Sequence, residues 1–189
     1  MSEKAQGFIP GQLLIAMPAM TDPRFERSVI YMCAHTTDGA MGLVLNRLVD
    51  SVTFPDLLEQ LGIKPGRLND EIRVHFGGPV ESGRGFLLHS AEYVLEGTLV
   101  VDQAIALTAS IDILKAIAEG GGPRQKLLAL GYAGWGPGQL EQEIQANGWL
   151  HAAADPAIVF DGQLDTKWTR AMAKLGVNPT SLSNQAGRA

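Results

Sequence analysis

Residues 28–46 read SVIYMCAHTTDGAMGLVLN, two apolar runs joined by a short polar segment. From Ser28 to His35 the apolar side chains fall on both alternating faces, the pattern of a strand that is covered on both sides. The segment 36–39 has turn composition, and the run from Met41 to Asn46 is again apolar on both faces. The stretch therefore predicts a β-hairpin at the centre of a sheet.

Further strands and helices surround this hairpin. Runs with strand composition occupy residues 12–17, 72–76, 85–89, 98–101, 126–133 and 149–153. Capping residues and apolar spacing predict helices over 53–61, 110–119, about ten residues from 139, and 165–175. Three of these helices have apolar stripes that we expect to be buried, namely Leu57, Leu58 and Leu61; Ile111, Leu114 and Ile117; and Trp168, Met172 and Leu175.

The order of these elements indicates the fold class. Helices follow groups of strands and do not alternate with them one for one, so the sequence predicts an α+β fold with a mixed, largely antiparallel sheet. The 22 glycines indicate many tight turns and strongly bent strands. We expect a single domain over residues 1–189, with 1–7 and 178–189 as loose tails.

Composition narrows the class of protein. Hydrophobic residues make up 46% of the 189 residues and charged residues 19%, which suits a folded chain and not a disordered one. Cys33 is the only cysteine, so an intramolecular disulfide is excluded and a cytoplasmic location is expected. The N-terminus lacks a signal-peptide pattern and no apolar run is long enough to cross a bilayer, so we expect no membrane insertion.

The charge pattern argues against direct nucleic-acid binding. The net charge is −5, no two Lys or Arg residues are adjacent, and no helix-turn-helix pattern is present. The nearest approach to a basic stripe is Lys167, Arg170 and Lys174 on the last predicted helix. We interpret those three residues as a solvated face.

Known catalytic and metal-binding motifs do not occur. The histidines and Cys33 lack ligand spacing, so neither a metal nor a cofactor is predicted, and no serine-hydrolase signature is present. The most specific local feature is the glycine-rich segment 131–141, which joins a strand to a helix start. It is interpreted as a structural turn, with an anion site as the alternative, because Glu141 and Glu143 already place negative charge near the helix N-terminus.

Polar residues at the ends of apolar strands are the candidate ligand-binding residues. We expect them to line a common depression on one side of the molecule, beside glycines that permit close approach. The candidates are His35, Asn46, Arg47, Gly78, Arg84, His89 and Trp135. The alternative is that each polar group holds its own loop by hydrogen bonds to nearby backbone.

Several segments together resemble the bacterial YqgE/AlgH family, in order from about Gly7 to Gly176. They are residues 11–18, 25, 28–31, 35, 39–42, 46–47, 77–80, 88–89 and 131–141. The resemblance implies a mixed sheet curled into a partial barrel with flanking helices, and a label of transcriptional regulator without an established mechanism or catalytic residues. Leu48 stands where the family usually has a proline after the Asn-Arg pair.

Three functions follow in order of preference. The first is a regulatory module that binds a protein or a small ligand, because it requires only a pocket. The second is an enzyme of unrecognised type, with a crevice near His35 and His89 whose groups have perturbed pKa values. The third is a regulator that binds DNA directly. The sequence favours a protein that is not an enzyme.

Overall fold

The predicted hairpin occupies the centre of a nine-stranded sheet in the computed structural model, which describes residues 7–66 and 72–178. The strands are β1 (Gln12–Ala16), β2 (Val29–Thr36), β3 (Gly39–Val44), β4 (Val74–Phe76), β5 (Val80–Ser90), β6 (Leu99–Val100), β7 (Ile105–Thr108), β8 (Lys126–Trp135) and β9 (Trp149–Ala153). The helices are α2 (Phe54–Gln60), α3 (Ile111–Ala118), α4 (Gln139–Gln145), α5 (Pro156–Phe160) and α6 (Leu164–Lys174).

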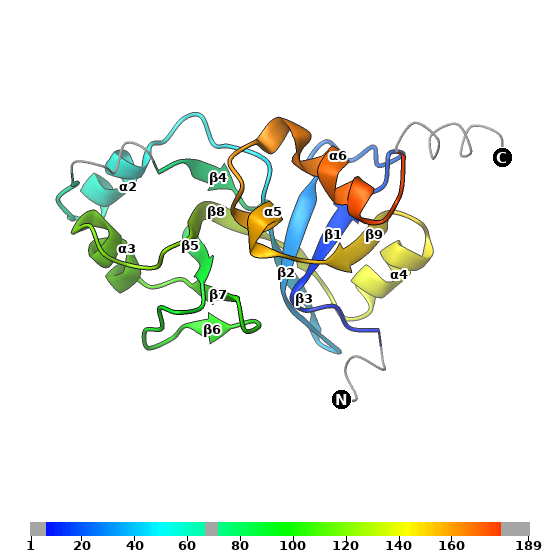
Figure 1. Cartoon of the computed structure of the whole chain (residues 1–189), viewed down its shortest axis with the longest axis horizontal. Helices are drawn as coiled ribbons and strands as arrows, with labels where there is room; N and C mark the ends of the chain where they lie inside the picture. The colour runs from blue at the N-terminus through cyan, green and yellow to red at the C-terminus, as the bar shows by residue number, and fades with distance from the viewer. Residues whose placement is uncertain (1–6, 67–71, 179–189) are drawn as a thin grey trace.

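The sheet is mixed, as predicted, and it curls into a half-barrel. The strand order is β6-β7-β5-β8-β3-β2-β1-β9 with antiparallel neighbours, while β4 pairs with β8 in parallel. Strand β8 joins two parts, because its end Ala133–Trp135 pairs with β3 and its earlier residues pair with β5 and β4. We call β1–β3, β9 and α4–α6 the hairpin half of the molecule. We call β4–β7, α2 and α3 the bulge half, because β5 contains a β-bulge. Figure 1 shows the two halves on opposite sides of β8.

The core has three apolar clusters that follow the two faces of the sheet. One cluster fills the inside of the curl and includes Tyr31 from the hairpin half, Phe86 from the bulge half and Trp168 from α6. A second cluster lies on the outer face of the hairpin half beneath α4, and a third lies beneath α2 and α3. Alternate residues of β2 enter the first and second clusters, which confirms that this strand is covered on both sides.

Local sequence explains how the helices start and stop. The Thr53 hydroxyl accepts a hydrogen bond from the Asp56 amide at 3.2 Å, and the Asp56 carboxylate accepts one from the Thr53 amide at 3.0 Å. This reciprocal cap fixes the start of α2 where the sequence predicted it. The predicted boundaries of α3 and α6 also agree with the structure to within one or two residues.

Several sequence predictions are wrong in detail. Strand β7 and helix α5 were not predicted. Lys167 does not belong to a solvated face: it is fully buried, because α5 lies against α6 and the Lys167 ammonium donates to the Val159 carbonyl at 3.0 Å. The stripe residues Leu61, Ile111 and Leu175 are exposed and not buried. Residues 1–6 and 179–189, on which most of the predicted tails fall, lie outside the described residues.

Candidate functional site

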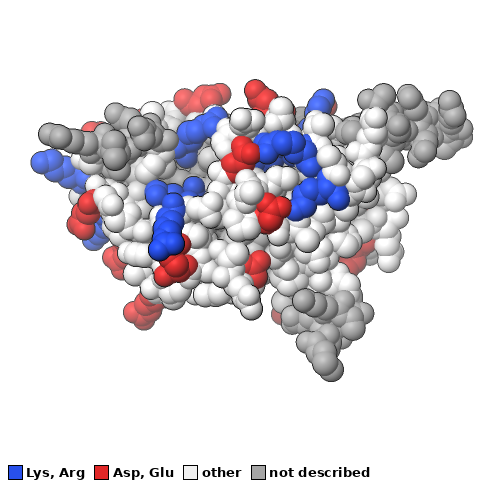
Figure 2. All heavy atoms as spheres, in the orientation of Figure 1, with Lys and Arg blue, Asp and Glu red and all other residues white. Residues whose placement is uncertain are grey.

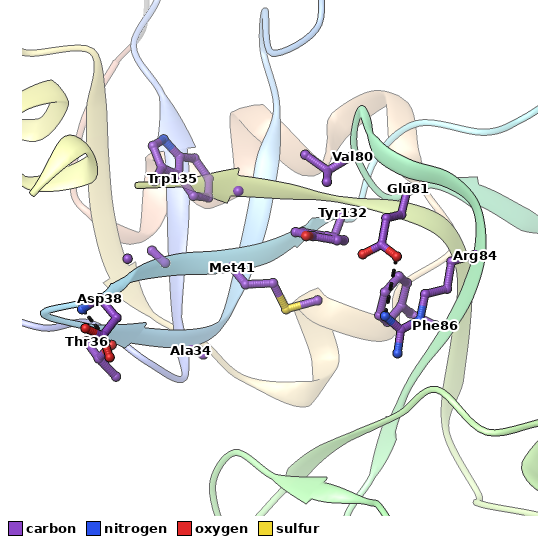
Figure 3. Close-up of a pocket in the computed structure, with 13 residues that line it drawn as sticks. Ala34, Thr36, Asp38, Met41, Val80, Glu81, Arg84, Phe86, Tyr132 and Trp135 are labelled. Carbon is purple, nitrogen blue, oxygen red and sulfur yellow. Dashed lines mark hydrogen bonds and ion pairs between the residues drawn. The ribbon is translucent and has the colours of Figure 1, made fainter. Parts of the chain in front are cut away.

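A hollow of about 570 Å³ lies between the β2–β3 turn and the start of β5. Its lining comes from both halves of the molecule and from β8, as Figure 3 shows. The lining residues are Ala34, Thr36, Asp38, Gly39, Ala40, Met41, Val80, Glu81, Arg84, Phe86, Tyr132, Gly134 and Trp135. We call this space the main hollow.

The floor of the main hollow is apolar and its rim is charged. The Phe86 and Tyr132 rings meet edge to face with centroids 5.7 Å apart, and Figure 3 shows the Met41 side chain extending from β3 toward them. The Arg84 guanidinium lies 5.0 Å from the centre of the Phe86 ring and 3.6 Å from the Glu81 carboxylate. Arg84, Glu81 and Asp38 are exposed, so the hollow opens to solvent between charges of both signs.

A large bulge in β5 creates the rim. Val80 pairs with Tyr132 and Gly85 pairs with Leu130, so residues 81–84 all stand opposite the single residue Gly131. A side chain at Gly131 would place its Cβ 2.3 Å from the Gly78 carbonyl oxygen, which is closer than atoms can approach. The β4–β5 connection therefore crosses β8 backbone to backbone, and the surplus residues of β5 loop outward.

Of the seven residues predicted to bind a ligand, Arg84 and Trp135 line the main hollow. Trp135 is 7% exposed, and its indole N–H donates to Glu143 at 3.1 Å. Gly78 lies at the strand crossing, where its Cβ would meet the Tyr132 backbone at 2.0 Å. The structure therefore brings two of the seven together at the hollow and gives Gly78 a packing role.

His35 is part of the interior. Its ring is 1% exposed, its Nδ1 accepts a hydrogen bond from the Ile9 amide at 3.1 Å, and its Nε2 lies 2.9 Å from the Glu141 carboxylate. Because Nδ1 is an acceptor in this arrangement, Nε2 carries the proton and donates it to Glu141. This hydrogen bond lowers the pKa of Glu141. His35 thus ties residue 9 and α4 to the sheet.

His89 is also held by its own neighbours. It is fully buried, with Nδ1 2.9 Å from the Ser90 carbonyl and Nε2 2.8 Å from the Thr108 hydroxyl. Since a carbonyl only accepts, Nδ1 is the donor and Nε2 accepts from Thr108. Burial lowers the pKa of His89, which favours this neutral ring. Among the described residues, His35 and His89 are both buried, so neither ring forms the accessible crevice that the sequence predicted near them.

Asn46 and Arg47 fasten the segment 22–29. The Asn46 side chain accepts from the Val29 amide at 3.0 Å and donates to the Arg27 carbonyl at 2.9 Å. Arg47 donates to the carbonyls of Pro23, Arg24 and Glu26 at 2.5–2.8 Å. The prediction of one depression shared by all seven residues is therefore wrong, and the alternative of internal hydrogen bonds describes four of them, His35, Asn46, Arg47 and His89. Leu48, where the family usually has a proline, forms an isolated antiparallel β-bridge with His75.

The glycine-rich segment 131–141 forms a structural turn. It joins β8 to α4 through Gly138, whose φ of 74° favours glycine at the start of this helix. Carboxylates already occupy the surroundings: Glu141 bonds to His35, and Glu143 accepts from the indoles of Trp135 and Trp149. These contacts favour the structural interpretation over an anion site.

Sequence reasoning missed most of the floor of the main hollow. Met41, Phe86 and Tyr132 belong to apolar strands, and their pattern is that of ordinary core residues. The signal that could have pointed to them is the polar run 81–84 inside an otherwise apolar strand, which is typical of a bulge.

Within residues 7–66 and 72–178, no group of three His, Cys, Asp or Glu side chains is placed to hold a metal ion. No helix among the described residues is long and apolar enough to span a membrane.

Known proteins resemble this chain over nearly its whole length. A family model described as AlgH-like matches residues 13–180. A UPF0301 protein of Rhodospirillum rubrum is 54% identical over 187 residues, covering 99% of this chain and 97% of that protein. The solution structure of the AlgH protein from Pseudomonas aeruginosa is 43% identical with a TM-score of 0.80, covering 93% of both chains. A crystal structure of a Corynebacterium diphtheriae protein, 23% identical with a TM-score of 0.71 over 92% of this chain and 91% of that one, shows the same fold.

Proposed function

This chain belongs to the AlgH-like family, and we propose that it is a binding module whose main hollow receives an apolar side chain from a segment of a partner protein. The observation that carries the proposal is the apolar floor of Met41, Phe86 and Tyr132 beneath an exposed rim of opposite charges. Such a rim orients a partner, while the floor supplies the apolar contact. The regulatory role implied by the family resemblance would act through this partner.

The openness of the main hollow favours a protein segment over an enclosed small ligand. Sites for small molecules bury most of the ligand surface. Here Thr36, Asp38, Val80, Glu81 and Arg84 are themselves exposed around the hollow. A loop or extended segment of a partner can cover this rim and insert one side chain, whereas a free small molecule would stay in contact with solvent.

The distribution of charge supports a protein partner and not DNA. Figure 2 shows Lys and Arg atoms over the α5–α6 region with acidic atoms beside them. Arg170 pairs with Asp161 and Lys174 pairs with Asp155, so these cations are already neutralised. Phosphate contacts dominate affinity for DNA and need unpaired cations, so we expect negligible binding to duplex DNA at physiological salt.

We also propose a cytoplasmic location and a single-domain organisation. Cys33 is buried and unpaired, and burial raises the pKa of its thiol to about 12. An inert, buried thiol suits a reducing compartment. The cluster inside the curl contains residues of both halves, which supports one folding unit.

Selection from a peptide library, followed by titration, tests the proposal. Selected peptides should contain an aromatic or aliphatic anchor, and their affinity should fall at least about tenfold for Met41→Gln. Val100→Gln, which changes a 51% exposed side chain on the distant β6, is the matched control and should leave affinity unchanged. Peptides whose affinity is the same for both variants would overturn the proposal. Sub-micromolar binding to duplex DNA with a steep salt dependence, measured by fluorescence anisotropy, would also overturn it.

A further inference from the structure

A second concave surface lies on the other side of the β5 bulge, around α2 and α3. It consists of two hollows of about 360 and 260 Å³ that share Leu57, Gln60, Gly83 and Leu130 in their linings. We call the pair the helix groove. Its smaller hollow lies between α2 and α3, and six leucine or isoleucine side chains line it: Leu57, Leu61, Ile111, Leu114, Leu128 and Leu130.

The apolar stripes of α2 and α3 include residues that stay exposed to solvent. Leu58 on α2 and Ile117 on α3 are buried in the cluster beneath these helices. By contrast, Leu61 at the end of α2 is 43% exposed and Ile111 at the start of α3 is 48% exposed. Both line the same small hollow. Apolar side chains that gather at one concavity indicate a ligand that completes their burial.

The same hollow has one polar end. Arg84 is the only charged residue among the described residues that line it. Ser110, the residue before α3, also lines it; its hydroxyl oxygen is buried, makes no cap hydrogen bond and has no partner in the described part of the chain. The opposing charges nearby are Glu81, which lies 3.6 Å from Arg84, and Asp112 in the first turn of α3. A ligand carboxylate would add a second acceptor for the Arg84 guanidinium, which has five N–H donors.

We propose that the helix groove binds a medium-chain fatty acid, with its hydrocarbon chain between Leu61 and Ile111 and its carboxylate at Arg84 and Ser110. The two hollows adjoin through the residues that they share, and the larger one lies within the range of about 300–1,000 Å³ that small-molecule sites occupy. A partner helix fits less well, because α2 and α3 have only 7 and 8 residues and so form a groove only about 12 Å long. This site is separate from the main hollow, although Arg84 borders both.

Titration of the full chain with decanoate, followed by amide chemical shifts, tests this site. Decanol and decyltrimethylammonium of equal chain length serve as the comparison ligands, with the two ionic ligands below their micelle concentrations and decanol below its solubility limit. Decanoate should bind saturably, with the largest shifts around residues 57–61 and 109–114, and at least about tenfold more tightly than either comparison ligand. Binding that does not saturate, or equal affinity for decanoate and decanol, would overturn the proposal.

Variants separate the two ends of the ligand. Arg84→Gln should abolish the preference for decanoate over decanol, while Leu61→Gln combined with Ile111→Gln should weaken both ligands at least about tenfold. Val94→Gln combined with Val100→Gln is the matched control, because these side chains are 58% and 51% exposed outside the groove. Met41→Gln should also leave decanoate binding unchanged, which distinguishes this site from the main hollow. Decanoate binding that survives the Leu61 and Ile111 double variant would overturn the assignment.

Discussion

The hairpin half and the bulge half use the same curled sheet but cover its outer face to different extents. In the hairpin half, α4 covers the outer face, and the aromatic rings of Phe25, Trp135 and Trp149 lie with centroids 5.8–6.5 Å apart. In the bulge half, two short helices cover the same face but leave Leu61 and Ile111 exposed beside a groove. Apolar surface that is not needed for folding is therefore concentrated in the bulge half and along its boundary.

The predicted site residues differ between the two halves in a similar way, although His89 on β5 is buried with its own partners. His35, Asn46 and Arg47 in the hairpin half all bond to nearby backbone or to α4. Arg84 on the bulge stays exposed, and within residues 7–66 and 72–178 its contacts are an ion pair with Glu81 and a ring contact with Phe86. Buried polar groups need hydrogen-bond partners, so the polar side chains of a fully covered region bond to other groups within the protein. Ligand recognition is thus expected where cover is incomplete, and four measurements test this contrast.

Trp168→Ala should have the largest effect, a loss of about 3 kcal/mol or more in the free energy of unfolding. Its indole is 5% exposed, belongs to the cluster inside the curl and donates to the Ala16 carbonyl at 2.8 Å. Chemical denaturation measures the loss, and Thr169→Ala on the exposed side of α6 is the control. A loss below about 1 kcal/mol would mean that the hairpin half does not depend on α6 for its cover.

Lys167→Met should show that the hairpin half buries a positive charge that lowers the free energy of unfolding. Burial lowers the pKa of Lys167 from 10.5 to about 8, so the folded chain binds this proton less tightly than the unfolded chain. The destabilisation by the buried ammonium is complete below pH 8 and disappears as pH rises toward 10.5. The contribution of Lys167 to the free energy of unfolding therefore increases with pH. The stability difference between the variant and the original chain should therefore change by roughly 3 kcal/mol over that range. Denaturation at several pH values measures it, and a constant difference would contradict the burial of the charge.

Gly131→Ala should destabilise the crossing that separates the halves, by roughly 3 kcal/mol. Gly131 and Gly120 both have positive φ, 75° and 91°, but a Cβ at Gly120 would meet nothing within 4 Å. Gly120→Ala should therefore lose only about 1 kcal/mol, from backbone strain alone. Thermal and chemical denaturation of the two variants compare them, and equal losses would show that close packing against Gly78 is unimportant.

Leu61→Gln and Ile111→Gln should have the smallest effects, within about 0.5 kcal/mol of the original stability. Leu58→Ala, one turn away on the buried side of α2, should lose about 3 kcal/mol. Denaturation of all three compares exposed and buried parts of the same apolar stripes. If the exposed pair proves as important as Leu58, these side chains serve folding, and the contrast between the halves fails.

The sequence determined most secondary structure because its signals are local. The two-sided apolar pattern of residues 28–46 specified a central hairpin, and Thr53 with Asp56 specified a helix start. Turn chemistry and caps act over a few residues, so they can be read without knowledge of the fold. Strand β7 and helix α5 were missed because segments of four and five residues are too short to show a clear period.

Only the tertiary structure decided which residues are accessible, and therefore where a site can lie. His35 and His89 have the chemistry of site residues, yet folding surrounds them with partners; Lys167 has the pattern of a surface residue, yet α5 covers it. Conversely, Leu61 and Ile111 have the spacing of core residues and remain exposed. Helical periodicity fixes the side of a helix on which a residue lies. How much of that side is covered depends on residues distant in sequence that pack against it. The sequence thus specified the elements, and their packing specified the hollows between them.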